Sequence, residues 1–158
     1  MGRRYQGPFP TPNFSKQVNE VAEPSLAGLY SGQITVGKAG VLIGAAKGAG
    51  KVVDVWMSIK GSGKDDSNEL ELSGNVYING TTCLSTNPVI AHVSGEAATN
   101  KTTKETGDTG ITQGVVNPDA RTYSAGDIFT CDFTLTRTAS PTTEMQNAVI
   151  MVDLEPDI

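Results

Sequence analysis

The chain has 158 residues, 37% of them hydrophobic and 18 of them glycine, a composition typical of one small domain of short strands and tight turns. Its formal net charge of −5 argues against nucleic acid as a partner, because an acidic chain repels phosphate backbones. No apolar run approaches the roughly 20 residues of a membrane span, and none follows Arg3 and Arg4, so we expect no membrane partner, no export signal, and synthesis in a cytoplasm.

Residues 1–30 differ in composition from the rest of the chain. Four prolines remove backbone donors and argue against a helix or a central strand: Pro8, Pro10, Pro12 and Pro24. The segment also carries more large apolar side chains than a flexible linker usually contains. We therefore predict an extended arm that orders on a neighbouring surface, with a flexible terminus as the alternative. The candidate interface residues are Arg3, Arg4, Tyr5, Phe9, Phe14 and Leu29.

From residue 33 onward apolar and polar residues alternate in short stretches. In residues 52–60 the alternation predicts a strand with a buried face of Val53, Val55, Met57 and Ile59. Trp56 falls on the opposite face of this strand, although its apolar neighbours favour a role in the core. Residues 69–78 repeat the pattern, with Leu70, Leu72, Val76 and Ile78 predicted to face inward.

Turn residues separate these strands from those that follow. Asn79-Gly80 lies between two apolar stretches and predicts a hairpin, because both residues accept positive φ. Residues 95–107 are polar and predict a long surface loop. Residues 111–116 and 128–137 predict further strands, the latter burying Phe129, Cys131, Phe133 and Leu135.

The last predicted strand covers residues 147–154. It buries either the set Ala148, Ile150, Val152 and Leu154 or the alternate set with Val149 and Met151. Pro156 then predicts a protected sheet edge. The two cysteines, Cys83 and Cys131, lie in predicted strands; a reducing compartment favours free, buried thiols, although a disulfide between them is compatible with the sequence.

About eight short strands joined by Gly, Pro, Asn and Asp turns predict an all-β fold. The expected architecture is an antiparallel, jelly-roll-like β-sandwich over residues 31–158, preceded by the proline-rich arm of residues 1–30.

Three motifs suggest chemistry at first sight. Residues 45–52 resemble a phosphate-binding loop, but the required first Gly and final Ser or Thr are missing and a strand follows, so we predict a turn. Asp65, Asp66 and Asn68 lack the spacing of a helix-loop-helix calcium site. His92 is the only histidine, which makes zinc improbable and leaves only a Ser-His-Asp triad assembled across the fold. We predict no catalytic residue, cofactor or metal, and no enzyme activity.

The order of several segments resembles the head decoration proteins of tailed bacteriophages. The likeness covers residues 50–156 and is carried by the residues 61–84 with their Asn79-Gly80-Thr81 hairpin, the Ala125-Gly126-Asp127 turn, the residues 135–144 and the closing residues 152–156. The resemblance implies a β-sandwich on the outside of an icosahedral shell that cements neighbouring capsomers.

From this resemblance we expect a structural virion protein that binds the major capsid protein at the capsid surface. Copies are expected to associate with one another, as a trimer in preference to a dimer. The alternative is a carbohydrate-binding or host-adhesion module, such as a head fibre or a tail accessory protein, in which Trp56 and Tyr77 are the aromatic candidates.

Overall fold

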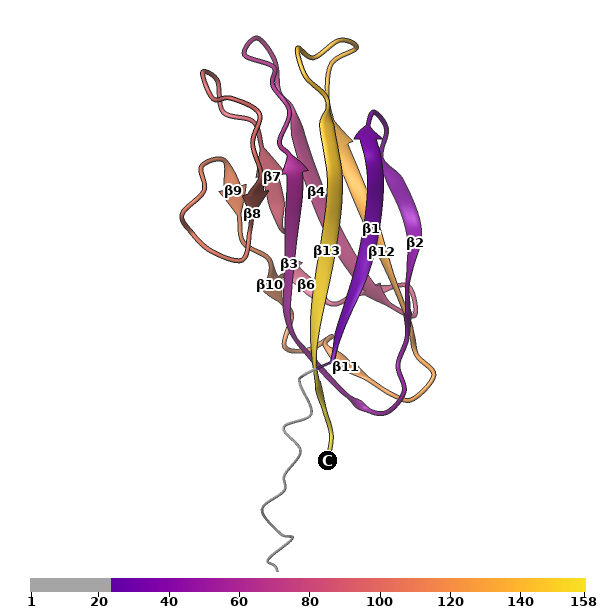
Figure 1. Cartoon of the computed structure of the whole chain (residues 1–158). Coiled ribbons are helices and arrows are strands. Elements are labelled where there is room, and N and C mark those ends of the chain that lie inside the picture. Colours follow the sequence, from indigo (N-terminus) through magenta and orange to yellow (C-terminus); the bar gives the residue numbers. More distant parts are fainter. Residues whose placement is uncertain (1–23) are drawn as a thin grey trace, which may run out of the picture.

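A computed structural model describes residues 24–158 (Figure 1), in which all regular structure is strand and every strand pairing is antiparallel. The predicted all-β, sandwich-like fold is therefore confirmed. Of the candidate interface residues, only Leu29 is described; Arg3, Arg4, Tyr5, Phe9 and Phe14 lie outside the described residues.

Two sheets pack face to face (Figure 1). The first sheet has the order β1-β13-β3-β11, with β8 also paired to β3. Its strands are β1 (Ser25–Ile34), β13 (Met145–Pro156), β3 (Gly50–Gly61), β11 (Thr122–Tyr123) and β8 (Lys101–Thr102). The strand β1 begins at Ser25, so residues 25–30 are part of this sheet and not, as the sequence suggested, the end of the arm.

The second sheet has the order β2-β12-β4-β7-β9, with β5 also paired to β4. Its strands are β2 (Lys38–Ala45), β12 (Ile128–Thr136), β4 (Glu71–Ile78), β7 (Val89–Ala91), β9 (Ile111–Thr112) and β5 (Thr81–Thr82). A separate two-stranded ribbon joins β6 (Leu84–Thr86) to β10 (Val115–Val116). The predicted hairpin is present: Asn79 and Gly80 have φ of 49° and 83°, as a type I′ turn between β4 and β5 requires.

The core lies between the sheets and is built from alternate residues of the long strands. The inward faces predicted for residues 69–78 and 128–137 are confirmed, with Leu135 only half-buried. In β13 the set that is buried is Ala148, Ile150, Val152 and Leu154. This strand lies between β1 and β3, so Pro156 ends a central strand, and the edge predicted there is wrong.

The strand β3 differs from its predicted pattern near its start. Val52 is buried and Val53 is only half-buried, because the register with β13 shifts between Asp153 and Leu154. Such a bulge adds one residue to one strand and reverses the alternation beyond it. Beyond the bulge, Val55, Met57 and Ile59 are buried as predicted, and Trp56 is on the outer face, so a core role for Trp56 is wrong.

The cysteines are unpaired and buried, as the sequence favoured. Burial raises the pKa of the Cys83 thiol to about 11 and that of Cys131 to about 12. Both thiols are therefore protonated at neutral pH and are poor nucleophiles.

Replacement of Gly28 by alanine is expected to destabilise the fold by about 1–3 kcal/mol. A Cβ at this position would lie 2.4 Å from Cys131 Sγ and 3.2 Å from Ile43 Cγ1, where no side chain fits. Chemical denaturation measures the effect. In the double variant Gly28→Ala/Cys131→Ala the removed sulfur makes room for the methyl group, so the loss should be smaller than the sum of the two single losses. Strict additivity would contradict this packing.

Candidate functional site

The two ends of the sandwich differ in chemistry. At one end, the start of β1, the end of β13 and the β2–β3 loop come together (Figure 1). They border a groove of about 330 Å³, lined by Pro24, Ser25, Leu26, Ala45, Ala46, Lys47, Gly48, Ala49, Tyr123, Leu154 and Pro156. Among residues 24–158 the lining is mostly apolar, and Lys47 is its only charged residue. The groove is therefore suited to binding apolar side chains.

The β2–β3 loop that borders this groove contains the residues that resembled a phosphate-binding loop. Ala46 donates its N–H to the carbonyl of Asp127 at 2.8 Å, and its own carbonyl accepts from the N–H of Gly126 at 2.8 Å. A strand and not a helix follows at Gly50. The loop opens no helix and therefore lacks the helix dipole of a phosphate site. It is a bent connection that crosses from the second sheet to the first, where a β-turn was predicted.

A second surface lies along the side of the sandwich formed by β1 and β2. Leu29 is 64% exposed, Val36 is 62% exposed and Leu42 is 67% exposed. Among the described strands, β1 and β2 each have a hydrogen-bonded neighbour on one side only. On the opposite side of the sandwich the outermost strands β8, β9 and β11 have two residues each. The β1–β2 side therefore carries the long open edges of both sheets.

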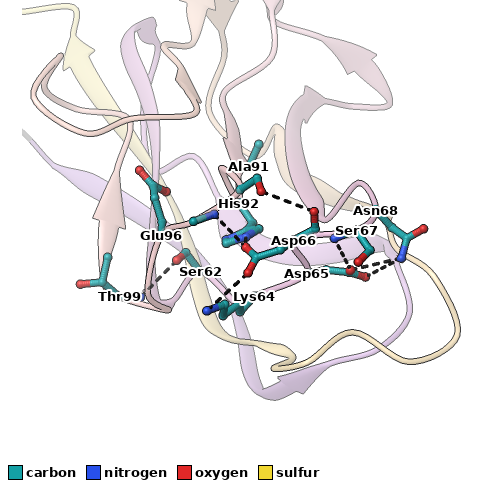
Figure 2. A network of polar contacts seen from close by, with 12 residues as sticks. Ser62, Lys64, Asp65, Asp66, Ser67, Asn68, Ala91, His92, Glu96 and Thr99 are labelled. Atoms are coloured by element: carbon teal, nitrogen blue, oxygen red, sulfur yellow. Dashed lines mark hydrogen bonds and ion pairs between the residues drawn. The ribbon is translucent and has the colours of Figure 1, made fainter.

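The opposite end of the sandwich carries a polar network (Figure 2). Asp66 accepts hydrogen bonds from His92 Nε2 at 2.9 Å and from the N–H of Gly95 at 2.9 Å, and forms an ion pair with Lys64 at 3.5 Å. The Gly95 N–H, then the His92 bond and the Lys64 charge, lower the pKa of Asp66 to about 2. The network ties the β3–β4 loop to the loop after β7.

The neighbouring Asp65 is buried and is directed at protein donors. Its carboxylate accepts from the Thr138 hydroxyl at 2.9 Å, from Asn68 Nδ2 at 3.2 Å and from the Ser67 N–H at 3.3 Å. The Thr138 bond is the main cause of its lowered pKa. Within residues 24–158, no three His, Cys, Asp or Glu side chains lie where they could hold a metal ion. The carboxylates of this loop therefore accept hydrogen bonds from protein donors and hold the loop in its conformation.

His92 does not have the arrangement of a catalytic triad. Its side chain is 1% exposed, Nε2 binds Asp66, and the buried Nδ1 has no hydrogen-bond partner among residues 24–158. A triad needs the second ring nitrogen to reach a nucleophile hydroxyl. The nearby Ser94 hydroxyl instead donates to the carbonyl of Asp66 at 3.4 Å.

Acid is expected to weaken the fold through Asp66. The pKa of Asp66 is lower in the folded chain than its ordinary value near 3.8, so its stabilising contribution is complete above about pH 4 and is lost as the pH falls toward about 2. Thermal unfolding of the wild type and of Asp66→Asn between pH 2 and 5 measures this. The difference between the two midpoints should shrink as the pH falls. A difference that stays constant over that range would contradict the assignment.

Trp56 and its neighbours form a small polar patch on the outer face of the first sheet. The Trp56 indole N–H donates to Asp153 at 3.4 Å, and Lys104 Nζ lies 5.5 Å from the ring centroid. Lys104 also pairs with Asp54 and Asp153. The lysine therefore covers the ring on this side.

The loop of residues 95–107 contains a residue that sequence reasoning missed. Lys101 was expected in a surface loop, yet its side chain is 2% exposed. Its ammonium group donates to Glu96 at 2.7 Å and to the carbonyls of Ala91 and Thr109 at 3.0 and 2.8 Å. The only signal in the sequence is the pairing of Glu96 with a lysine five residues later, which is too common to be informative.

Comparison of the chain with protein-family models, with curated proteins and with solved structures gives no match. In the part of the chain that the structure describes, no helix has the length and apolar character needed to cross a membrane.

Proposed function

We propose that the protein is a structural virion protein that decorates a phage capsid, binding the major capsid protein on the outer surface of the head. The observation that carries the proposal is the apolar groove at the end of the sandwich where residue 24 enters it. The residues before that point carry Tyr5, Phe9 and Phe14 in the sequence. Because Pro24 lines the groove, we take this end of the sandwich as the attachment end.

Attachment of this kind depends on buried area and on repetition. A stable contact buries about 800 Å² on each partner. When several copies act together, each contact raises the effective concentration of the next, so weak single contacts give durable attachment. Arg3 and Arg4 would add ion pairs with acidic groups of the shell, because their guanidinium groups bind carboxylates in pairs of hydrogen bonds.

Binding to phage heads that lack the protein tests the proposal. We expect the full chain to sediment with the heads and to protect them against heat, and a chain without residues 1–23 to lose most of that binding. The substitution Ala49→Arg introduces bulk and charge at an exposed position of the β2–β3 loop, in the groove but outside the edge strands, and should also weaken binding.

The matched control is Ala98→Arg, an exposed alanine in the loop after β7, outside the groove, which should bind as the wild type does. If all variants bind equally, the attachment end is wrong; if none of them, including the wild type, binds any undecorated head, the capsid proposal fails.

A second candidate function is adhesion to host carbohydrate, favoured by the position of Trp56 on the outer face beside the carboxylates of Asp54 and Asp153. An aromatic ring flanked by hydrogen-bonding groups suits a sugar ring, provided that Lys104 moves aside. A glycan array with the wild type and Trp56→Ala distinguishes the two functions: glycan binding that is lost in the variant would support adhesion.

A further inference from the structure

The two long edge strands carry almost no charge. The strand β1 (Ser25–Ile34) contains no charged residue, and β2 (Lys38–Ala45) contains only Lys38. Open edges are normally protected by charges, prolines or short strands, because free N–H and C=O groups pair with other chains. The opposite side of this sandwich is protected by two-residue strands, whereas β1 and β2 have ten and eight residues and are interrupted only by register shifts, one in β1 after Tyr30 and two where β2 pairs with β12. Edges of this length with so little charge indicate an interface.

The exposed backbone groups of β1 can be assigned. The N–H of Leu154 donates to the carbonyl of Pro24, so residue 24 belongs to a hydrogen-bonded pair with β13. Because these pairs alternate along an antiparallel ladder, the main-chain groups of Ser25, Ala27 and Leu29 point away from β13. The register is regular up to Tyr30, so this segment offers a straight edge.

The exposed leucines of the two edges lie at the same height along the strands. A Cβ added at Gly28 would lie 3.2 Å from Ile43, and one added at Gly44 would lie 3.7 Å from Leu26. Gly28 of β1 is therefore level with Ile43 of β2 along the strand direction, and Leu26 is level with Gly44. Leu29 is therefore level with Leu42. Each of the two side chains is exposed on the outer face of its own sheet.

We infer that a second copy of this chain covers the β1–β2 side, with β1 of one copy pairing antiparallel with β2 of the other. The strand β1 runs away from the groove and β2 runs back toward it (Figure 1). Rotation about an axis parallel to the strands leaves these directions unchanged, so β1 of one copy lies antiparallel to β2 of the other. Rotation about such an axis keeps all heights unchanged, so Leu29 of one copy meets Leu42 of the other on one continuous outer face.

The charge distribution favours a second copy over an unrelated partner. The chain carries a net charge of −5, and like-charged copies repel one another wherever these charges face each other. The β1–β2 side avoids this repulsion because its strands contain no acidic residue. The same axis places the grooves of all copies at one end. The paired edges share Ser25, Leu26 and Ala45 with the groove, whereas Leu29 and Leu42 lie outside it, so substitutions at the two leucines test the pairing separately from capsid attachment.

Cross-linking with introduced cysteines tests the pairing directly. Chains carrying Leu29→Cys and chains carrying Leu42→Cys, with different tags, are co-expressed and oxidised. Directly opposed residues of paired strands have Cα atoms about 4.5–5.5 Å apart, which suits a disulfide. We expect a mixed disulfide-linked dimer as the main product. The native Cys83 and Cys131 are buried and do not compete.

The control pairs Leu29→Cys with Val115→Cys, another exposed apolar position, which lies on β10 outside both open edges; it should give little mixed dimer. Mass measurement by light scattering adds a second readout: two or three chains for the wild type, and one chain for Leu29→Lys and for Ala27→Pro, which removes an outward N–H. A wild type that is monomeric at every concentration, or an assembly that these substitutions leave intact, would overturn the inference.

Discussion

Replacement of Phe133 by alanine is expected to lower the free energy of unfolding by about 3–5 kcal/mol, a large part of the stability of a domain of this size. Phe133 is 1% exposed and lies in β12, opposite Gly74 of β4. Its ring and that of Tyr30 pack in a T-shaped arrangement, with 5.7 Å between the centroids and 79° between the planes. The substitution leaves a cavity that β1 and β12 cannot close, because both strands are fixed in their sheets.

Urea denaturation measures this loss, and Leu29→Ala and Leu42→Ala are its matched controls. Both leucines are more than 60% exposed, so each change should alter the stability of the single chain by less than about 0.5 kcal/mol. If the two leucine variants are as unstable as Phe133→Ala at a protein concentration where the chain is a single copy, the description of the core is wrong. A loss that appears only at high concentration instead reports the association of copies.

Replacement of Lys101 by methionine is expected to cost roughly 1–3 kcal/mol, because removing the buried ammonium group leaves the acceptors around it without a donor. The Glu96 carboxylate and the carbonyls of Ala91 and Thr109 would each lose a hydrogen bond. Lys101 also lies in β8, which pairs with β3 at Ile59. We therefore expect the loop around it to open before the rest of the fold, measurable as faster amide exchange at residues 95–110.

Lys104→Met is the control for the buried lysine. Its side chain is 43% exposed and its partners Asp54 and Asp153 lie on the surface, so the expected loss is below about 1 kcal/mol. Equal losses for the two lysine variants would contradict the view that burial makes the difference. Both substitutions lie away from the groove, and head binding by the folded variants should be unchanged.

The two functional proposals concern surfaces that meet at Ser25, Leu26 and Ala45, and they are tested at residues that the surfaces do not share. The groove end concerns attachment to a shell, and the β1–β2 side concerns contact between copies. If chains with Leu29→Cys and Leu42→Cys form no mixed disulfide but still bind heads, capsid attachment is supported and the pairing of copies is contradicted. If the chains form the mixed disulfide but bind no head, the pairing of copies is supported and capsid attachment is contradicted.

The sequence by itself determined the long strands around residues 69–78 and 128–137, the hairpin and most of the buried face. Alternation in residues 69–78 and 128–137 and the Asn79-Gly80 turn are local signals, because a strand buries every second residue and a type I′ turn needs positive φ. Local signals could not show the bulge that reverses Val52 and Val53, since it depends on the register with β13. They could not choose between the two faces of residues 147–154 either.

Only the tertiary structure decided which surfaces are open. Lys101 looked like any loop lysine, and its burial follows from carbonyls contributed by β7 and by the loop before β9. Trp56 and Leu29 needed the sheet order to be placed, because a side chain's neighbours across strands are set by pairing and not by sequence. The groove and the two open edges exist only once β1, β2 and β13 are brought together, which is why long-range packing, and not composition, carries the function proposed for this protein.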